Sequence, residues 1–369
     1  MAGGLRLSVI AWRQGGPFKA LVNSFGVALL VGLQGCRDVP PIPITVDSDS
    51  LSLAAESRHY SFEEPCMGTL FRIDLYAASE EVASKASSRA FDVAHALNAR
   101  FTDYDPRSEL MELCRSGSNT PGTPLPLSPK LWEALKLGAE IERLSEGAFD
   151  PAVGHLTKIW RRSVRKGRLP QEGVLAEALA RTGMRHIELA ESQPEAIFLR
   201  SDVLLDLGGL GKGIAADAML DVLSLEGVES VVVLAGGDVR AGAPPPGEDG
   251  WAVTIRPYGS SSGQGIRKLR IHHCGVSTSG SVHQSVEIDG RHYSHIVDPK
   301  TGIGIAPGIA ATVVAPNTAL SDALATAMCV VGSKRGLVLA EKAGVEVLFV
   351  ERGEGLDGKV TGSLGFPAE

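Results

Sequence analysis

The clearest motif of the sequence lies within VLLDLGGLGKG, at residues 203–213. Its first five residues, VLLDL, are apolar enough to predict a strand that runs into a glycine turn. A helix is expected after the turn, with one apolar face formed by Ile214, Ala218, Met219 and Val222. A strand, a glycine turn and a helix in this order predict a mixed α/β fold.

The glycines and the lysine in this stretch are suited to binding an anion. Glycine allows backbone conformations closed to other residues, so amides near a helix N-terminus can be aimed at a phosphate. Lys212 adds a positive charge beside them. The spacing fits neither the P-loop nor the dinucleotide fingerprint, because no Ser or Thr follows Gly-Lys and the glycine register differs. We therefore expect a phosphate-binding loop of another kind, and the alternative is a tight turn with a solvated lysine.

Strands and helices alternate on both sides of this loop. Residues 69–75 alternate as a half-buried strand does, and residues 231–234 form an apolar, β-branched run typical of a central strand. Ser128 followed by Pro129 predicts a helix start, and Gly147 its end. The buried side of that helix is expected at Leu131, Leu135, Gly138 and Ile141. Two more helices are expected: one from about Ser79, with Val82, Ala86, Val93 and Leu97 as its apolar stripe, and one over residues 318–332.

The overall composition is that of an ordinary globular protein. Of the 369 residues, 44% are hydrophobic and 21% are charged. The net charge of −7 provides no basic surface for nucleic acid, so no nucleic-acid partner is expected. No linker after Ser57 divides the chain, and residues 58–369 are therefore expected to form one catalytic domain.

The first 36 residues predict an export signal. Basic residues precede a short apolar run at residues 25–33, which is built like the hydrophobic part of a secretion signal. The run ends in LQGC, which resembles a bacterial lipobox with an unusual Gln34, so Cys36 would carry a lipid. We expect a signal peptide at residues 1–36, a flexible tether at residues 37–57, and a membrane-anchored lipoprotein facing the periplasm, with the inner membrane favoured. The alternative is a buried signal-like segment with an ordinary cysteine.

The other cysteines have no metal or redox spacing and are expected to be mostly reduced and packed: Cys66, Cys114, Cys274 and Cys329.

Asp322 and Thr326 are candidates for a metal site. They lie four residues apart on an apolar helix, so their oxygens share one face. A carboxylate, a hydroxyl and nearby carbonyls suit Mg²⁺, which completes its coordination with waters and substrate phosphates. The alternative is that Asp322 interacts with the helix dipole while Thr326 bonds back to a carbonyl. The spacing alone favours this second interpretation.

His295 is a candidate base. The sequence HIVDPKTG, at residues 295–302, predicts a turn and places His295 at the end of a strand. A structural histidine is the alternative. The small hydroxyl residues at positions 277–279 could line a ligand pocket.

Eight motifs in one order resemble the ApbE family, the FAD:protein FMN transferases. They are CMGT at 66–69, YDPRSEL at 104–110, GAFDPAVG at 147–154, the glycine loop, GGD at 236–238, STSG at 277–280, HIVDP at 295–299 and DALATA at 322–327. Each motif is weak by itself, but eight in the right order, spanning residues 66–332, are specific.

The resemblance implies a T-fold-like α/β architecture with FAD at its centre. The residues that match the family's FAD contacts are Met67, Tyr104, Ala148, Phe149, Asp150, Asp206, Lys212 and Ile296. Those that match its Mg²⁺ ligands are Asp322 and Thr326 through side chains, and Gly209 and Ala325 through carbonyls.

The resemblance also implies a reaction. FAD would be split at its pyrophosphate, and its FMN half would be transferred to a Thr or Ser hydroxyl of an acceptor protein, with release of AMP. We expect His295 to be the base and Asp298 to orient it. The expected acceptor is a subunit of a membrane redox complex. Two alternatives stay open: a Mg²⁺-dependent FAD pyrophosphatase and a non-catalytic periplasmic FAD-binding lipoprotein.

Overall fold

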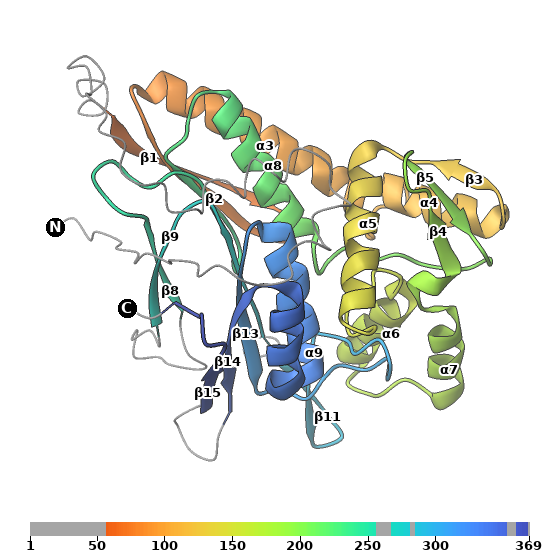
Figure 1. The fold of residues 1–369 in the computed structure, drawn as a ribbon. Helices are drawn as coiled ribbons and strands as arrows, with labels where there is room; N and C mark the ends of the chain where they lie inside the picture. The colour runs from red at the N-terminus through yellow and green to blue at the C-terminus, as the bar shows by residue number, and fades with distance from the viewer. Residues whose placement is uncertain (1–56, 256–266, 281–284, 353–358, 368–369) are drawn as a thin grey trace.

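An eight-stranded antiparallel sheet forms the centre of the computed structural model, which describes residues 57–255, 267–280, 285–352 and 359–367 (Figure 1). The predicted signal peptide and almost all of the predicted tether, with Cys36, lie outside the described residues. In spatial order the strands are β1 (Arg58–Cys66), β2 (Thr69–Ala77), β6 (Val231–Ala235), β7 (Asp238–Ala241), β10 (Gly275–Gly280), β13 (Ile309–Ala315), β14 (Glu346–Glu351) and β15 (Lys359–Gly362). The predicted strands at residues 69–75 and 231–234 are confirmed as β2 and β6, and β6 lies in the interior of the sheet.

Three helices cover one face of this sheet: α3 (Glu80–Phe101), α8 (Gly211–Leu225) and α9 (Thr318–Ala343) (Figure 1). Because side chains alternate along a strand, Val231 and Val233 pack under the helices while Val232 faces the other way. There it meets the hairpin of β8 (Trp251–Ile255) and β9 (Arg267–Ile271). The sheet is therefore buried on both faces in its central part.

A helical lobe lies beside the sheet and carries several site residues. It contains α4 (Glu109–Asn119), α5 (Pro129–Leu144), α6 (Gly154–Lys166), α7 (Glu172–Arg181), the short η1 (Met184–His186), and a small sheet of β3 (Pro124–Pro126), β5 (Glu195–Phe198) and β4 (Ile187–Leu189). A separate hairpin, β11 (Ser285–Ile288) and β12 (Arg291–Ser294), packs on Trp160 of α6. One apolar core runs through both the sheet layer and this lobe. The predicted mixed α/β class is confirmed.

The predicted strand at residues 203–207 is wrong. The segment belongs to no strand and instead bonds to the start of α6 and the turn before it: Asp206 N donates to Pro151 O over 2.7 Å, and Gly154 N donates to Leu204 O over 2.9 Å. Its apolar side chains, such as Leu205, are buried all the same. Burial without a sheet partner therefore explains the apolar run.

The predicted helices exist, but two of their buried faces differ from expectation. Helix α5 begins at Pro129 after its Ser128 cap, and its four predicted residues are buried. In α8 the fully enclosed residues include Ala215 and Ala216, while Ile214, Ala218 and Val222 are only partly buried. In α3, Val82 is 42% exposed, and the inner face consists largely of alanines: Ala83, Ala86, Ala90 and Ala94. Small residues face inward because α3 packs directly on α8.

Helix α9 is both long and apolar. Among the described residues, it is the one helix long and apolar enough to cross a membrane, but half of its most apolar stretch is buried. It packs on β10 and β13, as a core helix does. At Gly332, where we predicted its end, the backbone leaves helical geometry with φ 79°, and a second helical segment then continues to Ala343. The glycine therefore breaks the helix without ending it.

Candidate active site

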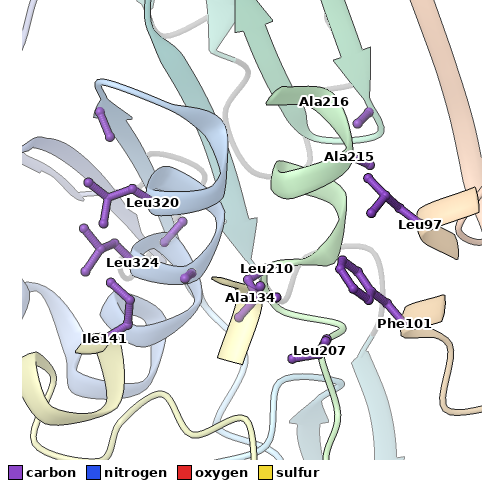
Figure 2. Close-up of a cluster of buried hydrophobic side chains, with 14 of the residues drawn as sticks. Leu97, Phe101, Ala134, Ile141, Leu207, Leu210, Ala215, Ala216, Leu320 and Leu324 are labelled. Atoms are coloured by element: carbon purple, nitrogen blue, oxygen red, sulfur yellow. The ribbon is translucent and has the colours of Figure 1, made fainter. Parts of the chain in front are cut away.

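The glycine loop is fixed in place by its own leucines. Leu207 and Leu210 are buried where α3, α5, α8 and α9 meet, near Phe101 and Ala134 (Figure 2). The carbonyl of Leu207 accepts hydrogen bonds from the amides of Leu210 and Gly211. These contacts hold the backbone of the loop rigidly at the start of α8.

Lys212 lies between two buried carboxylates. Its Nζ is 2.7 Å from Oδ2 of Asp238 and 3.1 Å from Oδ2 of Asp322. The amide of Gly213 also donates to Asp322 Oδ2, over 3.1 Å. The carboxylate of Asp322 therefore occupies the anion position at the N-terminus of α8, and the alternative of a solvated lysine is wrong.

The charges in this cluster do not cancel. Burial lowers the pKa of Lys212, but the charges of Asp322 and Asp238 outweigh that effect and raise it overall, so the ammonium stays charged. Burial raises the pKa of Asp238 to about 6, and the charge of Asp322 acts in the same direction. The cluster contains two carboxyl groups and one amine, an excess of acid over base that an added cation would balance.

Asp322 does not cap its own helix. The N-terminal amides of α9 are bound by other residues: Leu320 N donates to Asn317 Oδ1, and Asp217 accepts from Thr318 N and Ala319 N. Asp322 also lies beyond the first turn of α9, which contains no acidic residue, so the alternative of a first-turn partner for the helix dipole is wrong. Thr326 contacts a residue outside its own helix: its Oγ1 lies 3.2 Å from Oγ of Ser279 in β10, within hydrogen-bond distance.

Gly209 lies against Thr326. A Cβ at Gly209 would lie 3.7 Å from Thr326 Oγ1 and only 2.9 Å from Cε2 of Phe149, so a side chain would crowd the space between the loop and α9. Within the described residues, no group of three His, Cys, Asp or Glu side chains could hold a metal ion. A cation here would depend on one carboxylate together with hydroxyl, carbonyl and phosphate oxygens. Such a donor set suits Mg²⁺.

The predicted FAD contacts are divided between the two lobes. Met67 lies at the two-residue turn between β1 and β2, with φ 48°, and Ile296 is buried in the common core. Phe149 and Ala148 are buried after α5. Tyr104 is 77% exposed. These positions are compatible with a ligand between the lobes, but the FAD contacts themselves stay predictions.

Asp150 and Asp206 both fold back on their own turns. Asp150 accepts from Ala152 N over 2.8 Å, and Asp206 accepts from Gly208 N over 2.8 Å. Burial raises the pKa of Asp150 to about 6. The other carboxylate oxygen of Asp206 accepts from Arg161 of α6 over 3.0 Å.

His295 and Asp298 follow β12. The side chain of His295 is exposed, as a base open to a substrate needs to be. The carboxylate of Asp298 holds its own turn, accepting from Lys300 N over 2.9 Å and from Thr301 Oγ1 over 3.2 Å. These contacts give Asp298 a structural role, and its orienting role stays a prediction. A pocket of about 680 Å³ lies beside this turn. Asp298 and Thr301 line it, and the residues of the Lys212 cluster do not.

Three residues of the site were not predicted: Asp238, Arg161 and Asp103. Asp238 ends the GGD motif at residues 236–238, after a buried strand, but the motif was not assigned a role at the site. Arg161 lies among other basic residues of α6, and nothing in the sequence distinguishes it from them. Asp103 directly precedes Tyr104, but its partner lies 58 residues away.

Comparison with known proteins places this arrangement in one family. The sequence model of the ApbE family matches residues 67–349. The chain is 29% identical over 314 residues to the FAD:protein FMN transferase of Treponema pallidum, covering 80% of this chain and 85% of that one. It is 31% identical over 257 residues to the enzyme of the same name from Chlamydia trachomatis, covering 69% and 77%.

Solved structures agree with these sequence matches. The flavin transferase ApbE from Vibrio cholerae superposes with a TM-score of 0.74 at 25% identity, covering 84% of this chain and 98% of that chain. The apo form of the flavinyl transferase ApbE from Pseudomonas stutzeri gives 0.73 at 26% identity, covering 84% and 96%.

Proposed function

The chain belongs to the ApbE family, and we infer that it is an FAD:protein FMN transferase, the activity for which its relatives are named. The observation that supports this most directly is the cluster of Lys212, Asp238 and Asp322 at the start of α8, with Thr326 and the backbone of Gly209 beside it. A buried centre with an excess of acid over base, next to a glycine loop, suits a divalent cation together with a pyrophosphate.

In the proposed reaction, a Thr or Ser hydroxyl of the acceptor protein attacks the phosphorus of the FMN phosphate. A new P–O bond forms to the acceptor, the P–O bond to the adenylate breaks, and AMP leaves. The hydroxyl proton passes to a base, for which we propose His295. The protein contributes chiefly position and electrostatics, as in other phosphoryl transfers.

The site residues fit a Mg²⁺ ion. Asp322 and Thr326 would hold it through their side chains, and Gly209 and Ala325 through their carbonyls. When bound, Mg²⁺ neutralises charge that develops on the phosphate oxygens. Lys212, already held by two carboxylates, fixes Asp322 in position and supplies a second positive charge on the same side of the loop.

The cellular setting forms part of the proposal. We propose that the chain is a lipoprotein anchored through Cys36 to the inner membrane and facing the periplasm, and that its acceptor is a subunit of a membrane redox complex. The sequence at residues 25–36 supports this proposal. Labelling with a lipid precursor, compared between the wild type and Cys36→Ala, tests the anchor.

The activity is tested by incubating the protein with FAD, Mg²⁺ and a co-expressed acceptor, followed by mass spectrometry of the acceptor. The expected result is an added FMN on a Thr or Ser. AMP release measured without acceptor separates transfer from hydrolysis: equal release with and without acceptor would favour the pyrophosphatase. For the base, His295→Ala is expected to bind FAD but to lose transfer, and near-normal transfer would exclude His295.

A further inference from the structure

Arg161 of α6 joins two segments predicted to contact FAD. Its guanidinium donates to Oδ2 of Asp206, in the glycine loop, over 3.0 Å. It also donates to Oδ2 of Asp103, in the segment that follows α3. Both carboxylates are buried, each with 7% of its side chain exposed.

The same guanidinium covers one face of the Tyr104 ring. Its central carbon lies 4.7 Å from the ring centroid, within cation–π distance. Tyr104 is 77% exposed, so most of its surface is open to solvent although Arg161 lies against one face of the ring. A large aromatic ring supported on one face and largely exposed is suited to stacking with a flat ligand.

Arg161 is well fixed for such a role. Its neighbour Trp160 is buried and donates from Nε1 to Ser294 O over 2.9 Å, which anchors α6 to β12. The planar guanidinium can also engage two carboxylates and a ring at once, which an ammonium cannot do. Burial raises the pKa of Asp103, and the nearby charge of Asp206 raises it further, so the pair of acids depends on Arg161.

We propose that Arg161 is a positioning residue for FAD: it holds the Tyr104 ring as a rigid platform on which a flat ring of FAD stacks. This inference rests on the proposed function, which makes FAD the substrate. A ring fixed before binding loses less freedom when the ligand arrives, so fixing it strengthens binding.

A double-mutant cycle tests the inference. FAD affinity is measured by titration for Arg161→Met, Tyr104→Ala and the double variant, with Arg162→Met, at an exposed neighbouring arginine, as the matched control. We expect Arg161→Met to weaken FAD binding by roughly tenfold in the Tyr104 background and by less than about twofold in the Tyr104→Ala background. Equal losses in both backgrounds, or no loss, would overturn the inference. Arg161→Met leaves two buried carboxylates without a partner and could fail to fold for that reason. In that case Asp103→Asn is added to remove one of the two charges, and the same double-mutant cycle is measured in the Asp103→Asn background.

Two further readouts refine the result. Titration with FMN, which carries the flavin ring, and with ADP, which carries the adenine ring, shows which ring stacks on Tyr104. Only the ligand that carries the stacking ring should bind more weakly to Arg161→Met than to the wild type. In transfer assays KM for FAD should rise while kcat changes by less than about twofold, as expected for lost binding that is equal in ground and transition states. Unchanged KM in Arg161→Met with intact transfer would refute the positioning role and leave the proposed function standing. FAD binding by the wild type without FMN transfer would refute the proposed function alone.

Discussion

At the scale of single residues, the neighbours of Asp322 exclude one of the two interpretations that its spacing left open, and its role as a metal ligand stays a prediction. The spacing of four residues between Asp322 and Thr326 on one helix is compatible both with a helix cap and with a pair of metal ligands. The structure excludes the cap, because Asn317 and Asp217 already bind the N-terminal amides of α9. The partner of Asp322 is Lys212, 110 residues earlier. Such a pair cannot be found from local sequence, because it exists only once α8 and α9 are packed together.

Replacing Asp322 tests the metal at this scale. Asp322→Asn keeps the shape and an oxygen to accept from Gly213 N, but removes the charge. We expect Mg²⁺-dependent AMP release to fall by roughly a hundredfold or more, since a cation that neutralises phosphate charge contributes several kcal/mol to the transition state. Isothermal titration with Mg²⁺ in the presence of FAD checks the cause. Asp92→Asn, at an exposed position on α3, is the control, and an equal loss in both variants would contradict the assignment.

The carboxyl of Asp150 predicts a pH dependence of stability. Burial raises its pKa to about 6 in the folded chain, from 3.8. The folded state therefore binds the proton more tightly, and this contribution to stability is present below about pH 4 and is lost as the pH rises through about 6. Asp150→Asn keeps the hydrogen bond from Ala152 N and cannot ionise. Relative to the wild type, it should gain roughly 1–3 kcal/mol in free energy of unfolding between pH 4 and pH 7.

Urea unfolding of the ligand-free protein at the two pH values measures this difference directly. Because Asp150→Asn is compared with the wild type at each pH, the titration of the other acids cancels. A difference between the two proteins that stays constant across this range would mean that Asp150 titrates normally.

At the scale of elements, the sequence predicted what local chemistry controls. The start of α5 follows from a serine cap and a proline, and β6 follows from a β-branched run. The segment at residues 203–207 was wrongly predicted because an apolar run shows burial and not the hydrogen-bond partner. The buried face of α3 was also wrongly predicted. It consists largely of alanines because α8 packs closely against it, and the periodicity of the α3 sequence carries no information about that neighbour.

The contact between α8 and α9 predicts very different effects at two neighbouring glycines. A Cβ at Gly213 would lie 2.4 Å from the carbonyl oxygen of Thr318 and 2.7 Å from Cα of Ala319, whereas a Cβ at Gly211 would meet nothing within 4 Å. Because the obstacle is backbone, Gly213→Ala must push the helices apart, and we expect a loss of about 1–3 kcal/mol or more. Gly211→Ala should be neutral or stabilising by up to about 1 kcal/mol, since alanine favours helix.

Chemical unfolding of both variants, with transfer assays alongside, measures this contrast. Gly213→Ala should also lower activity, because the amide that positions Asp322 moves with α8. Similar stabilities for the two variants would mean that the helices are not in close contact at this point.

At the scale of the whole molecule, the site joins the two lobes. Lys212, Asp322 and Ser279 belong to the sheet layer and its helices, while Tyr104, Phe149 and Arg161 belong to the helical lobe or the segments leading into it. The predicted FAD contacts come from both lobes, so the proposed FAD site would take residues from motifs that are spread along the chain. Their order could be read from the sequence, but which of them meet could not.

This division predicts that the ligand stabilises the molecule as a unit. FAD at about one hundred times its Kd should add about 2.7 kcal/mol to the free energy of unfolding, which corresponds to a rise in Tm of several degrees for a chain of this size. Mg²⁺ should increase the shift in the wild type but not in Asp322→Asn. Hydrogen exchange should show protection rising together in the Tyr104 segment and at the α8–α9 contact, because one ligand bridges both. Protection confined to one lobe, or an equal shift with AMP alone, would mean that FAD does not bind between the lobes.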